Sequence, residues 1–203
     1  MSSRWSRLLI GTAGTVFVLI VILLLVPVLS GQSSFTKSVP LAEKQIPGIV
    51  TQAKQGLPIR LKIPRINVDA AVVYVGVTSQ GAMDVPKGPT DVAWFDLGPR
   101  PGEIGSAVIA GHEGWKDGIP AVFDNLYALQ KGDKISVIDE KGATTMFVVR
   151  ELRTYGEHQD ASDVFDSSDG KAHLNLITCE GIWNQLTKSY SNRIVVFTDK
   201  VGE

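Results

Sequence analysis

The sequence predicts a mainly β fold, a barrel or sandwich with short helices, that follows one N-terminal membrane span. Three features predict it: a long uncharged apolar stretch near the start, short runs rich in Val, Ile, Thr and Phe after it, and Gly- or Pro-rich segments between those runs. The 203 residues include 20 basic and 21 acidic side chains. This near-neutral balance provides no electrostatic basis for wrapping nucleic acid, so we expect no nucleic-acid partner.

The first element is a transmembrane helix predicted at residues 8–29. These residues carry no charge, and as an α-helix at about 1.5 Å per residue they would span roughly 33 Å, enough for a bilayer core. Arg4 and Arg7 precede the stretch, so residues 1–7 are expected in the cytoplasm and the rest of this single-pass membrane protein outside the cell. A cleaved signal peptide is the alternative, but its apolar region usually has only about 7–15 residues.

Residues 30–56 are predicted to form a stalk, because they mix Ser, Thr, Lys, Gln and Pro without sustained periodicity. Residues 57–203 then have the length of one ordinary domain with its own core. Cys179 is the single cysteine of the sequence. An extracytoplasmic domain with one cysteine has no internal disulfide, so its stability must come from the core.

The body of the chain consists of predicted strands with turn-forming residues between them. The DEKG sequence at 139–142 lies between two alternating runs and predicts a β-hairpin. Apolar residues recur at helical spacing only in short pieces such as 121–129 and 161–165. Many short strands with few helices indicate a barrel or a sandwich. The predicted strands are residues 59–63, 70–77, 106–111, 134–139, 144–156, 173–179 and 193–198.

A cysteine and a histidine each follow an apolar run. Cys179 ends its run where we expect the strand to give way to a loop, a position that suits a nucleophile. A buried structural cysteine is the alternative, although an unpaired thiol outside the cell is an oxidation liability. His112 directly follows the apolar run 106–111. It is the candidate partner that would raise the thiolate fraction of Cys179. His173 lies about 20 Å from the thiol along the same extended run, and His158 is predicted in an exposed loop.

Arg193 begins the last predicted strand. An antiparallel return through the loop 180–192 would bring its guanidinium beside the thiol, where it could stabilise an oxyanion or hold a substrate carbonyl. An ordinary exposed strand arginine is the alternative. The three histidines and one cysteine never reach zinc-ligand spacing, and the acidic segment 160–170 misses the EF-hand pattern. We therefore expect no metal or cofactor, and a solvated acidic loop rather than a calcium site.

The order of these pieces resembles a sortase, the membrane-anchored cysteine transpeptidase of bacterial surfaces. The resemblance rests on AGH ending at His112, VFDNLYALQKGDKISV at 122–137, LITC ending at Cys179 and RIVVF starting at Arg193. It covers about residues 57–199 and implies a closed eight-stranded β-barrel. It also implies that the cysteine is the nucleophile, the histidine the general acid and base, and the arginine the oxyanion or substrate-positioning group.

The resemblance further implies residues that bind the substrate. Thr178 matches a family threonine that assists substrate binding, and the backbone N–H of Glu180 would be the oxyanion donor. Four apolar residues flank the predicted site and could line a groove for the Leu-Pro part of a sorting signal: Val164, Phe165, Ile182 and Trp183. Core packing or loop anchoring is the alternative role for these four side chains.

By resemblance, the substrates are a surface protein with a Leu-Pro-x-Thr-Gly-like (LPxTG-like) C-terminal sorting signal and an amine of a peptidoglycan precursor. Asn175 stands where the family signature Thr-Leu-x-Thr-Cys has its first threonine, which we expect to mark a subclass difference. Residues 94–112 are most similar to the compact class D to F sortases. The sequence contains neither the Asp-Pro-aromatic lid nor the second span typical of pilin-polymerising sortases, which favours cell-wall attachment. A hydrolytic cysteine protease of the same fold and a noncatalytic anchored β-domain are the other classes.

Overall fold

The computed structural model describes residues 54–184 and 189–202, with residues 182–184 and 189 described by their backbone only. The predicted membrane span and most of the predicted stalk lie outside these residues. Within the described part of the chain, no helix is long and apolar enough to cross a membrane.

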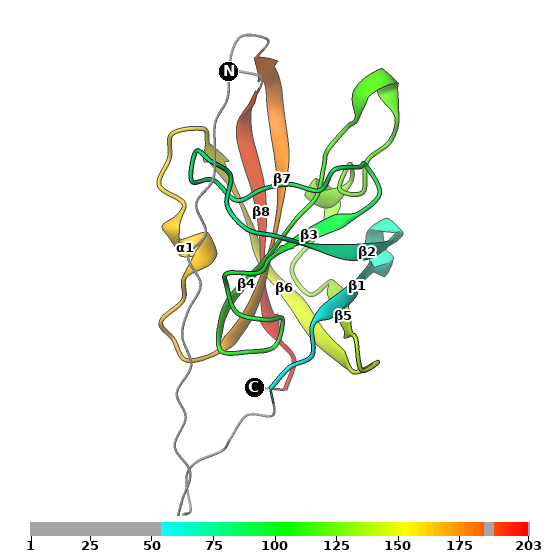
Figure 1. Ribbon diagram of the computed structural model, residues 1–203, viewed down its shortest axis with the longest axis vertical. Helices are drawn as coiled ribbons and strands as arrows, with labels where there is room; N and C mark the ends of the chain where they lie inside the picture. Colours follow the sequence, from blue (N-terminus) through cyan, green and yellow to red (C-terminus); the bar gives the residue numbers. More distant parts are fainter. Residues whose placement is uncertain (1–53, 185–188, 203) are drawn as a thin grey trace, which may run out of the picture. The chain divides into compact units, whose positions relative to one another are not determined.

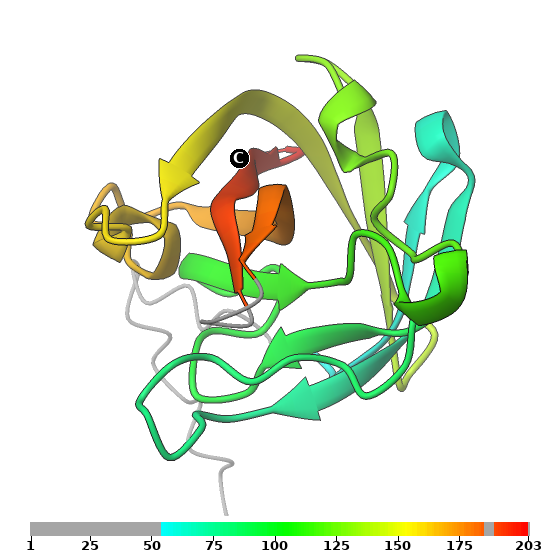
Figure 2. The ribbon, with the colours of Figure 1, turned by 90° about the horizontal axis from the view of Figure 1, so that it is seen from above.

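Eight strands close into a β-barrel, as the resemblance implied. They follow one another around the barrel in the order β1-β2-β3-β4-β7-β8-β6-β5, and β5 pairs with β1 to complete the circle. Figure 2 shows the strands wrapped around a common interior. The β2–β3 and β4–β7 pairs are parallel, and the other neighbours are antiparallel. The strands are β1 (Pro58–Ile63), β2 (Val68–Val75), β3 (Val92–Phe95), β4 (Gly105–Ala110), β5 (Lys134–Asp139), β6 (Thr144–Gly156), β7 (Ala172–Asn184) and β8 (Ser189–Lys200).

The predicted hairpin at DEKG is confirmed. The carboxylate of Asp139 accepts hydrogen bonds from the backbone N–H groups of Lys141 and Ala143, at 2.9 and 2.8 Å. Gly142 has a φ of +80°, a conformation that glycine adopts without steric cost. All seven predicted strands are present, whereas the four-residue strand β3 was not predicted, because so short a segment shows no usable alternation.

Two expectations about secondary structure were wrong. Residues 121–129 form turns and one short 3-10 helix, η3 (Leu126–Ala128), rather than an α-helical piece. Their apolar spacing reflects burial instead, since Phe123, Leu126 and Leu129 all lie in the core. Cys179 does not end its strand, because β7 continues past a β-bulge to Asn184. The predicted helix at 161–165 is confirmed as α1 (Ser162–Phe165), and two further 3-10 helices are η1 (Pro64–Ile66) and η2 (Lys116–Gly118).

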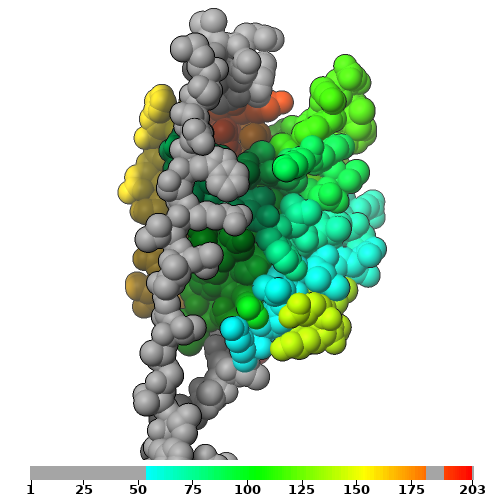
Figure 3. Space-filling view, in the orientation of Figure 1, coloured from blue at the N-terminus to red at the C-terminus, as the bar shows by residue number. Residues whose placement is uncertain are grey.

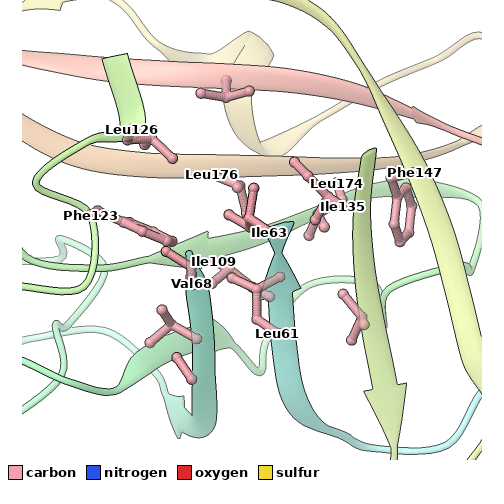
Figure 4. Close-up of a cluster of buried hydrophobic side chains, with 14 of the residues drawn as sticks. Leu61, Ile63, Val68, Ile109, Phe123, Leu126, Ile135, Phe147, Leu174 and Leu176 are labelled. Atoms are coloured by element: carbon pink, nitrogen blue, oxygen red, sulfur yellow. The ribbon is translucent and has the colours of Figure 1, made fainter. Parts of the chain in front are cut away.

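The barrel interior is filled by apolar side chains from all eight strands, and Figure 4 shows part of this core. In β7, Leu174 and Leu176 point into this core. Asn175 and Ile177 alternate with them along the strand and therefore face the outside of the barrel. Burying each large aliphatic or aromatic chain contributes about 1.5–3 kcal/mol. The largest fully buried side chains include Leu61, Ile63, Ile109, Phe123, Leu126, Ile135, Phe147, Leu174 and Leu176.

The outer face of β4, β7 and β8 is also covered, by the connection that contains α1 (Figure 1). Asn175 anchors this connection, because its Nδ2 donates a hydrogen bond of 2.6 Å to the backbone oxygen of Val164. The asparagine that departs from the family signature therefore holds α1 against the barrel. The cluster that packs α1 against the barrel consists of Val108, Tyr155, Val164, Val195 and Phe197.

Two projections leave the same end of the barrel. The β7–β8 hairpin extends upward in Figure 1, and the loop after β4, residues 111–121, extends beside it. Figure 3 shows this loop standing out at the upper right of the surface. Both projections begin at residues that the sequence marked as functional candidates.

Candidate active site

The register of three neighbouring strands brings the three predicted catalytic residues together. In the parallel β4–β7 pair, Ala110 lies opposite Ile177, so His112, two residues further on, is level with Cys179. In the antiparallel β7–β8 pair, Cys179 lies opposite Arg193. Neighbouring strands are about 4.8 Å apart, so His112 just after β4, Cys179 on β7 and Arg193 on β8 form a row.

The row lies on the outer face of the barrel. Side chains alternate along a strand, so Cys179 belongs to the same face as Ile177, which packs beneath α1. Arg193 belongs to the same face as Val195, while the intervening Ile194 points into the core. A thiol and a guanidinium on this face can meet a peptide without disturbing the barrel core.

A cleft of about 710 Å³ contains the row. His112, Cys179 and Arg193 all line it. A second cleft of about 590 Å³ adjoins the first, and both are lined by Val85, Ala110, Ile177 and Arg193. The second cleft includes Val164 and Phe165 in its wall, so two of the predicted groove residues lie next to the row. Their role in binding a substrate stays a prediction.

The ring of His112 is held in one orientation. Its Nε2 lies 2.7 Å from the backbone oxygen of Pro86, in the connection between β2 and β3. A carbonyl oxygen only accepts, so Nε2 carries the hydrogen of this bond. In neutral His112 the ring nitrogen without a hydrogen is therefore Nδ1. Trp115 packs edge-on against the ring with centroids 4.7 Å apart, which further restricts the ring.

Cys179 is partly buried, and its charged neighbours shift the pKa of its thiol in opposite directions. Burial raises the pKa of the Cys179 thiol, because the thiolate loses solvation. The positive charge of Arg193 lowers this pKa, and the negative charge of Glu113 raises it. Arg193 therefore favours the reactive thiolate, and Glu113 opposes it.

The guanidinium of Arg193 is fixed by its own strand. Its Nη1 donates hydrogen bonds to the backbone oxygens of Tyr190 and Asn192, at 3.0 and 2.8 Å. Two carbonyl acceptors on one nitrogen restrict the planar group, so its charge is held at the border of the two clefts.

Thr178 joins the cysteine strand to the histidine loop. The side chain is only 3% exposed, and its Oγ1 donates a hydrogen bond of 2.9 Å to the backbone oxygen of Gly111. The N–H of Gly111 donates in turn to the oxygen of Ile177, at 3.0 Å. A Cβ at position 111 would lie 2.5 Å from the ring of Phe123, so the close approach requires glycine. The predicted role of Thr178 in substrate binding stays a prediction beside this positioning contact.

A β-bulge follows the cysteine. Glu180 pairs with Asn192 and Trp183 with Tyr190, so two residues of β7 oppose one of β8. Gly181, in the bulge, has a φ of +89°. A bulge interrupts the regular ladder next to the thiol, which is compatible with the predicted oxyanion donor at Glu180. The Glu180 side chain itself accepts a 3.3 Å hydrogen bond from Thr154 of β6.

Two further groove candidates, Ile182 and Trp183, lie on β7 by their backbone. Their side chains lie outside the described part of the structure. Their predicted contribution to a substrate groove therefore stays a prediction.

The other two histidines lie away from the row. His173 is buried, with Nδ1 3.0 Å from Asp199 and Nε2 3.1 Å from Asp169. His158 is exposed in a turn, as predicted. In the acidic segment, Asp163 accepts hydrogen bonds from Tyr155 and Arg153, so protein donors engage this carboxylate. Among the described residues, no group of three or more His, Cys, Asp or Glu side chains is arranged to hold a metal ion.

Sequence reasoning missed several residues that line the cleft around the row, among them Val85, Glu113 and Trp115. Glu113 and Trp115 follow His112 in the chain, and this adjacency was the one signal that could have singled them out. Val85 comes from an irregular connection between strands, so only the tertiary structure places it here.

Comparisons with known proteins support the barrel fold. The family model described as the sortase domain matches residues 61–201. No curated protein matches the chain. Sortase C-1 from Actinomyces oris has a similar structure, with a TM-score of 0.57 and 24% identity over 72% of this chain and 76% of that chain.

Two further solved structures are similar at comparable levels. A lid mutant of sortase A from Corynebacterium diphtheriae has a TM-score of 0.57 and 20% identity over 75% of this chain and 74% of that chain. A sortase D5 transpeptidase from Clostridium perfringens has a TM-score of 0.53 and 22% identity over 71% of this chain and 79% of that chain. At these identities the likeness shows the fold, and the class D to F placement stays a prediction.

Proposed function

Because the chain belongs to the sortase family of cysteine transpeptidases, we propose that it cleaves an LPxTG-like sorting signal and transfers the acyl group to an amine of a peptidoglycan precursor. The observation that supports this most directly is the row of His112, Cys179 and Arg193 in one cleft. Residues 8–29 would anchor the enzyme in the cell membrane, with residues 1–7 in the cytoplasm and the barrel outside. Tethering at the outer membrane face raises the effective concentration of the enzyme near both substrates.

The first half-reaction forms a thioester. The Cys179 thiolate attacks the carbonyl carbon of the threonine in the sorting signal, and the oxyanion is stabilised by the Arg193 guanidinium and the Glu180 N–H. His112 donates the proton on Nδ1 to the departing glycine nitrogen as the C–N bond breaks. This leaves neutral His112 and an acyl group on the sulfur.

The adjoining cleft would hold the Leu-Pro part of the signal. Its wall is mostly apolar, and Phe165 packs edge-on against Phe95 with ring centroids 5.6 Å apart. Phe165 is 39% exposed, so part of its ring is accessible to a ligand. A leucine side chain buried against such a wall gains about 1.5–3 kcal/mol.

The second half-reaction transfers the acyl group. The acceptor nitrogen, as a free amine, attacks the thioester carbonyl carbon, and the C–S bond breaks. His112 takes the proton that the nitrogen loses, so the products are an amide, the Cys179 thiolate and protonated His112. The enzyme returns to its starting protonation state.

Intact mass spectrometry of the full chain with a set of sorting-signal peptides tests the proposal. We expect an acyl adduct on the wild-type enzyme, no adduct on Cys179→Ala, and a ligated peptide when an amine is added. His112→Ala should also lose turnover, whereas the matched His158→Ala, at an exposed histidine, should keep it. Normal turnover by Cys179→Ala would refute the assignment.

The same assay separates the other function classes. Release of free acid at an unchanged rate with added amine would indicate a hydrolytic protease. Ligation only to a lysine of a second surface protein would indicate a pilin-polymerising sortase. A Cys179 that does not react with a small alkylating reagent would indicate a noncatalytic binding domain.

Arg193→Lys tests the role of the guanidinium. The ammonium of lysine keeps the charge but lacks the planar fork. We expect a loss of about 100-fold in turnover, the size seen when one oxyanion donor is removed. Steady-state kinetics with one peptide measure it, and wild-type rates would remove Arg193 from the site.

A further inference from the structure

Glu113 is a carboxylate in the catalytic cleft that the mechanism does not use. It follows His112 directly and lines the same cleft as Cys179 and Arg193. Its Oε2 is buried and has no hydrogen-bond partner among the described residues. Buried carboxylate oxygens are normally paired, because an unpaired one loses its solvation without compensation. The Glu113 carboxylate is therefore incompletely paired in the free protein, and a hydrogen-bond donor that arrives with a substrate would stabilise it.

Glu113 does not hold the loop that carries it. The backbone N–H groups of Gly114 and Ala121 both donate to the carboxylate of Asp124, at 2.7 and 3.0 Å. The N–H of Phe123 donates to the oxygen of His112, which closes the loop from the other side. These bonds fix residues 111–124 without Glu113, so the loop fold does not require a carboxylate at position 113.

The charge of Glu113 does not help the first half-reaction. It raises the pKa of the Cys179 thiol and so opposes thiolate formation. Burial raises the pKa of Glu113 itself, and the carboxylates of Glu180 and Asp124 raise it further. This part of the cleft is negative, which suits a cation. Of the two substrates proposed above, the acceptor amine is the one whose reacting group arrives as a cation.

We propose that Glu113 binds the ammonium group of the acceptor amine and sets a preference for cationic acceptors. This proposal rests on the transpeptidase function proposed above. An ammonium N–H would donate to the carboxylate of Glu113, and the nitrogen would be held in the cleft beside the thioester on Cys179. One ammonium proton passes to solvent before the nitrogen attacks, and His112 takes the second. Lys116 and Arg193, which line the same cleft, would repel a cation, so the acceptor is directed to the Glu113 side.

The test uses the full chain in detergent and Glu113→Gln, which keeps the shape and removes the charge. The acyl-enzyme is formed with a sorting-signal peptide and resolved by cationic amines (triglycinamide, lysinamide, diaminopimelate) or by hydroxylamine, which is uncharged at neutral pH. We expect Glu113→Gln to raise the KM for cationic amines about 10-fold to 100-fold, the range for losing a charged hydrogen bond. The KM for hydroxylamine should not change.

Glu140→Gln is the matched control, because it removes one negative charge at the exposed turn between β5 and β6. It should change neither KM. An equal rise in KM for hydroxylamine and for cationic amines in Glu113→Gln would overturn the proposal. A wild-type KM for hydroxylamine below the KM for all three cationic amines would overturn it as well.

The failure of this proposal is distinguishable from the failure of the proposed function. Intact mass shows directly whether the acyl-enzyme forms. If it never forms on the wild-type enzyme, the transpeptidase function fails. If it forms on both proteins and Glu113→Gln leaves the KM for cationic amines unchanged, only the role of Glu113 fails.

Discussion

Replacing Thr178 by valine removes one hydroxyl between the cysteine strand and the histidine loop. Valine has nearly the same shape and is also β-branched, so the strand and the core packing are kept. What is lost is the 2.9 Å hydrogen bond from Oγ1 to the backbone oxygen of Gly111. We expect Thr178→Val to lower both stability and activity.

The size of the stability effect follows from the burial of this bond. Thr178 is 3% exposed and Gly111 is buried, so water does not replace the lost donor. An unsatisfied buried carbonyl costs about 1–3 kcal/mol of unfolding free energy. For a domain of this size, about 1 kcal/mol corresponds to roughly 2–4 °C in Tm. The expected decrease in Tm is therefore about 2–12 °C by the same conversion.

Activity should fall further than stability alone explains, because Gly111 adjoins His112. A displacement of catalytic groups by about 1 Å can cost about 100-fold in rate. Thr198→Val is the matched control: its Oγ1 also donates to a buried carbonyl, that of Leu174, at 2.7 Å, but lies far along the strand from the thiol. It should lose similar stability and keep kcat/KM.

Urea unfolding and peptide kinetics on the two variants decide between these outcomes. An unfolding free energy of Thr178→Val equal to wild type would refute the stability argument. Equal losses of kcat/KM in Thr178→Val and Thr198→Val would refute the positioning argument.

Three further predictions concern the surroundings of the row. Gly181→Ala should lose about 1–2 kcal/mol by urea unfolding, because φ is +89° and a Cβ would meet Ser191 Oγ; Gly156→Ala, with open space around it, should not, and equal losses would contradict this. Asn175→Ala removes the bond to α1, so the KM for the sorting peptide should rise, and an unchanged KM would separate α1 from the groove. Burial raises the pKa of Glu113, so its ionised form destabilises the fold as pH rises through that pKa. Glu113→Gln should therefore unfold at a higher urea concentration than wild type at pH 7 but not below about pH 4. A difference in urea midpoint that does not depend on pH would refute this.

Local patterns predicted much of this fold because the responsible interactions are local. The DEKG hairpin is an example, since the Asp139 side chain closes the turn on residues two and four positions away. The same kind of reasoning failed at residues 121–129, where the helical spacing of apolar residues came from burial in the core. It also placed the end of β7 too early, because a bulge and pairing with β8 continue the strand past Cys179.

The sequence by itself determined which chemical groups are available: one thiol, a histidine after an apolar run and an arginine at the start of the last strand run. Their roles came from the resemblance to a family. The tertiary structure alone decided that His112 lies level with Cys179, through a parallel pairing of β4 and β7 across 67 positions of the chain. It also decided which ring nitrogen of His112 bonds to Pro86, and it left Oε2 of Glu113 buried without a hydrogen-bond partner among the described residues. The physical reason is that strand register and burial depend on how the apolar faces of all the strands pack together, and no short segment of sequence contains that information.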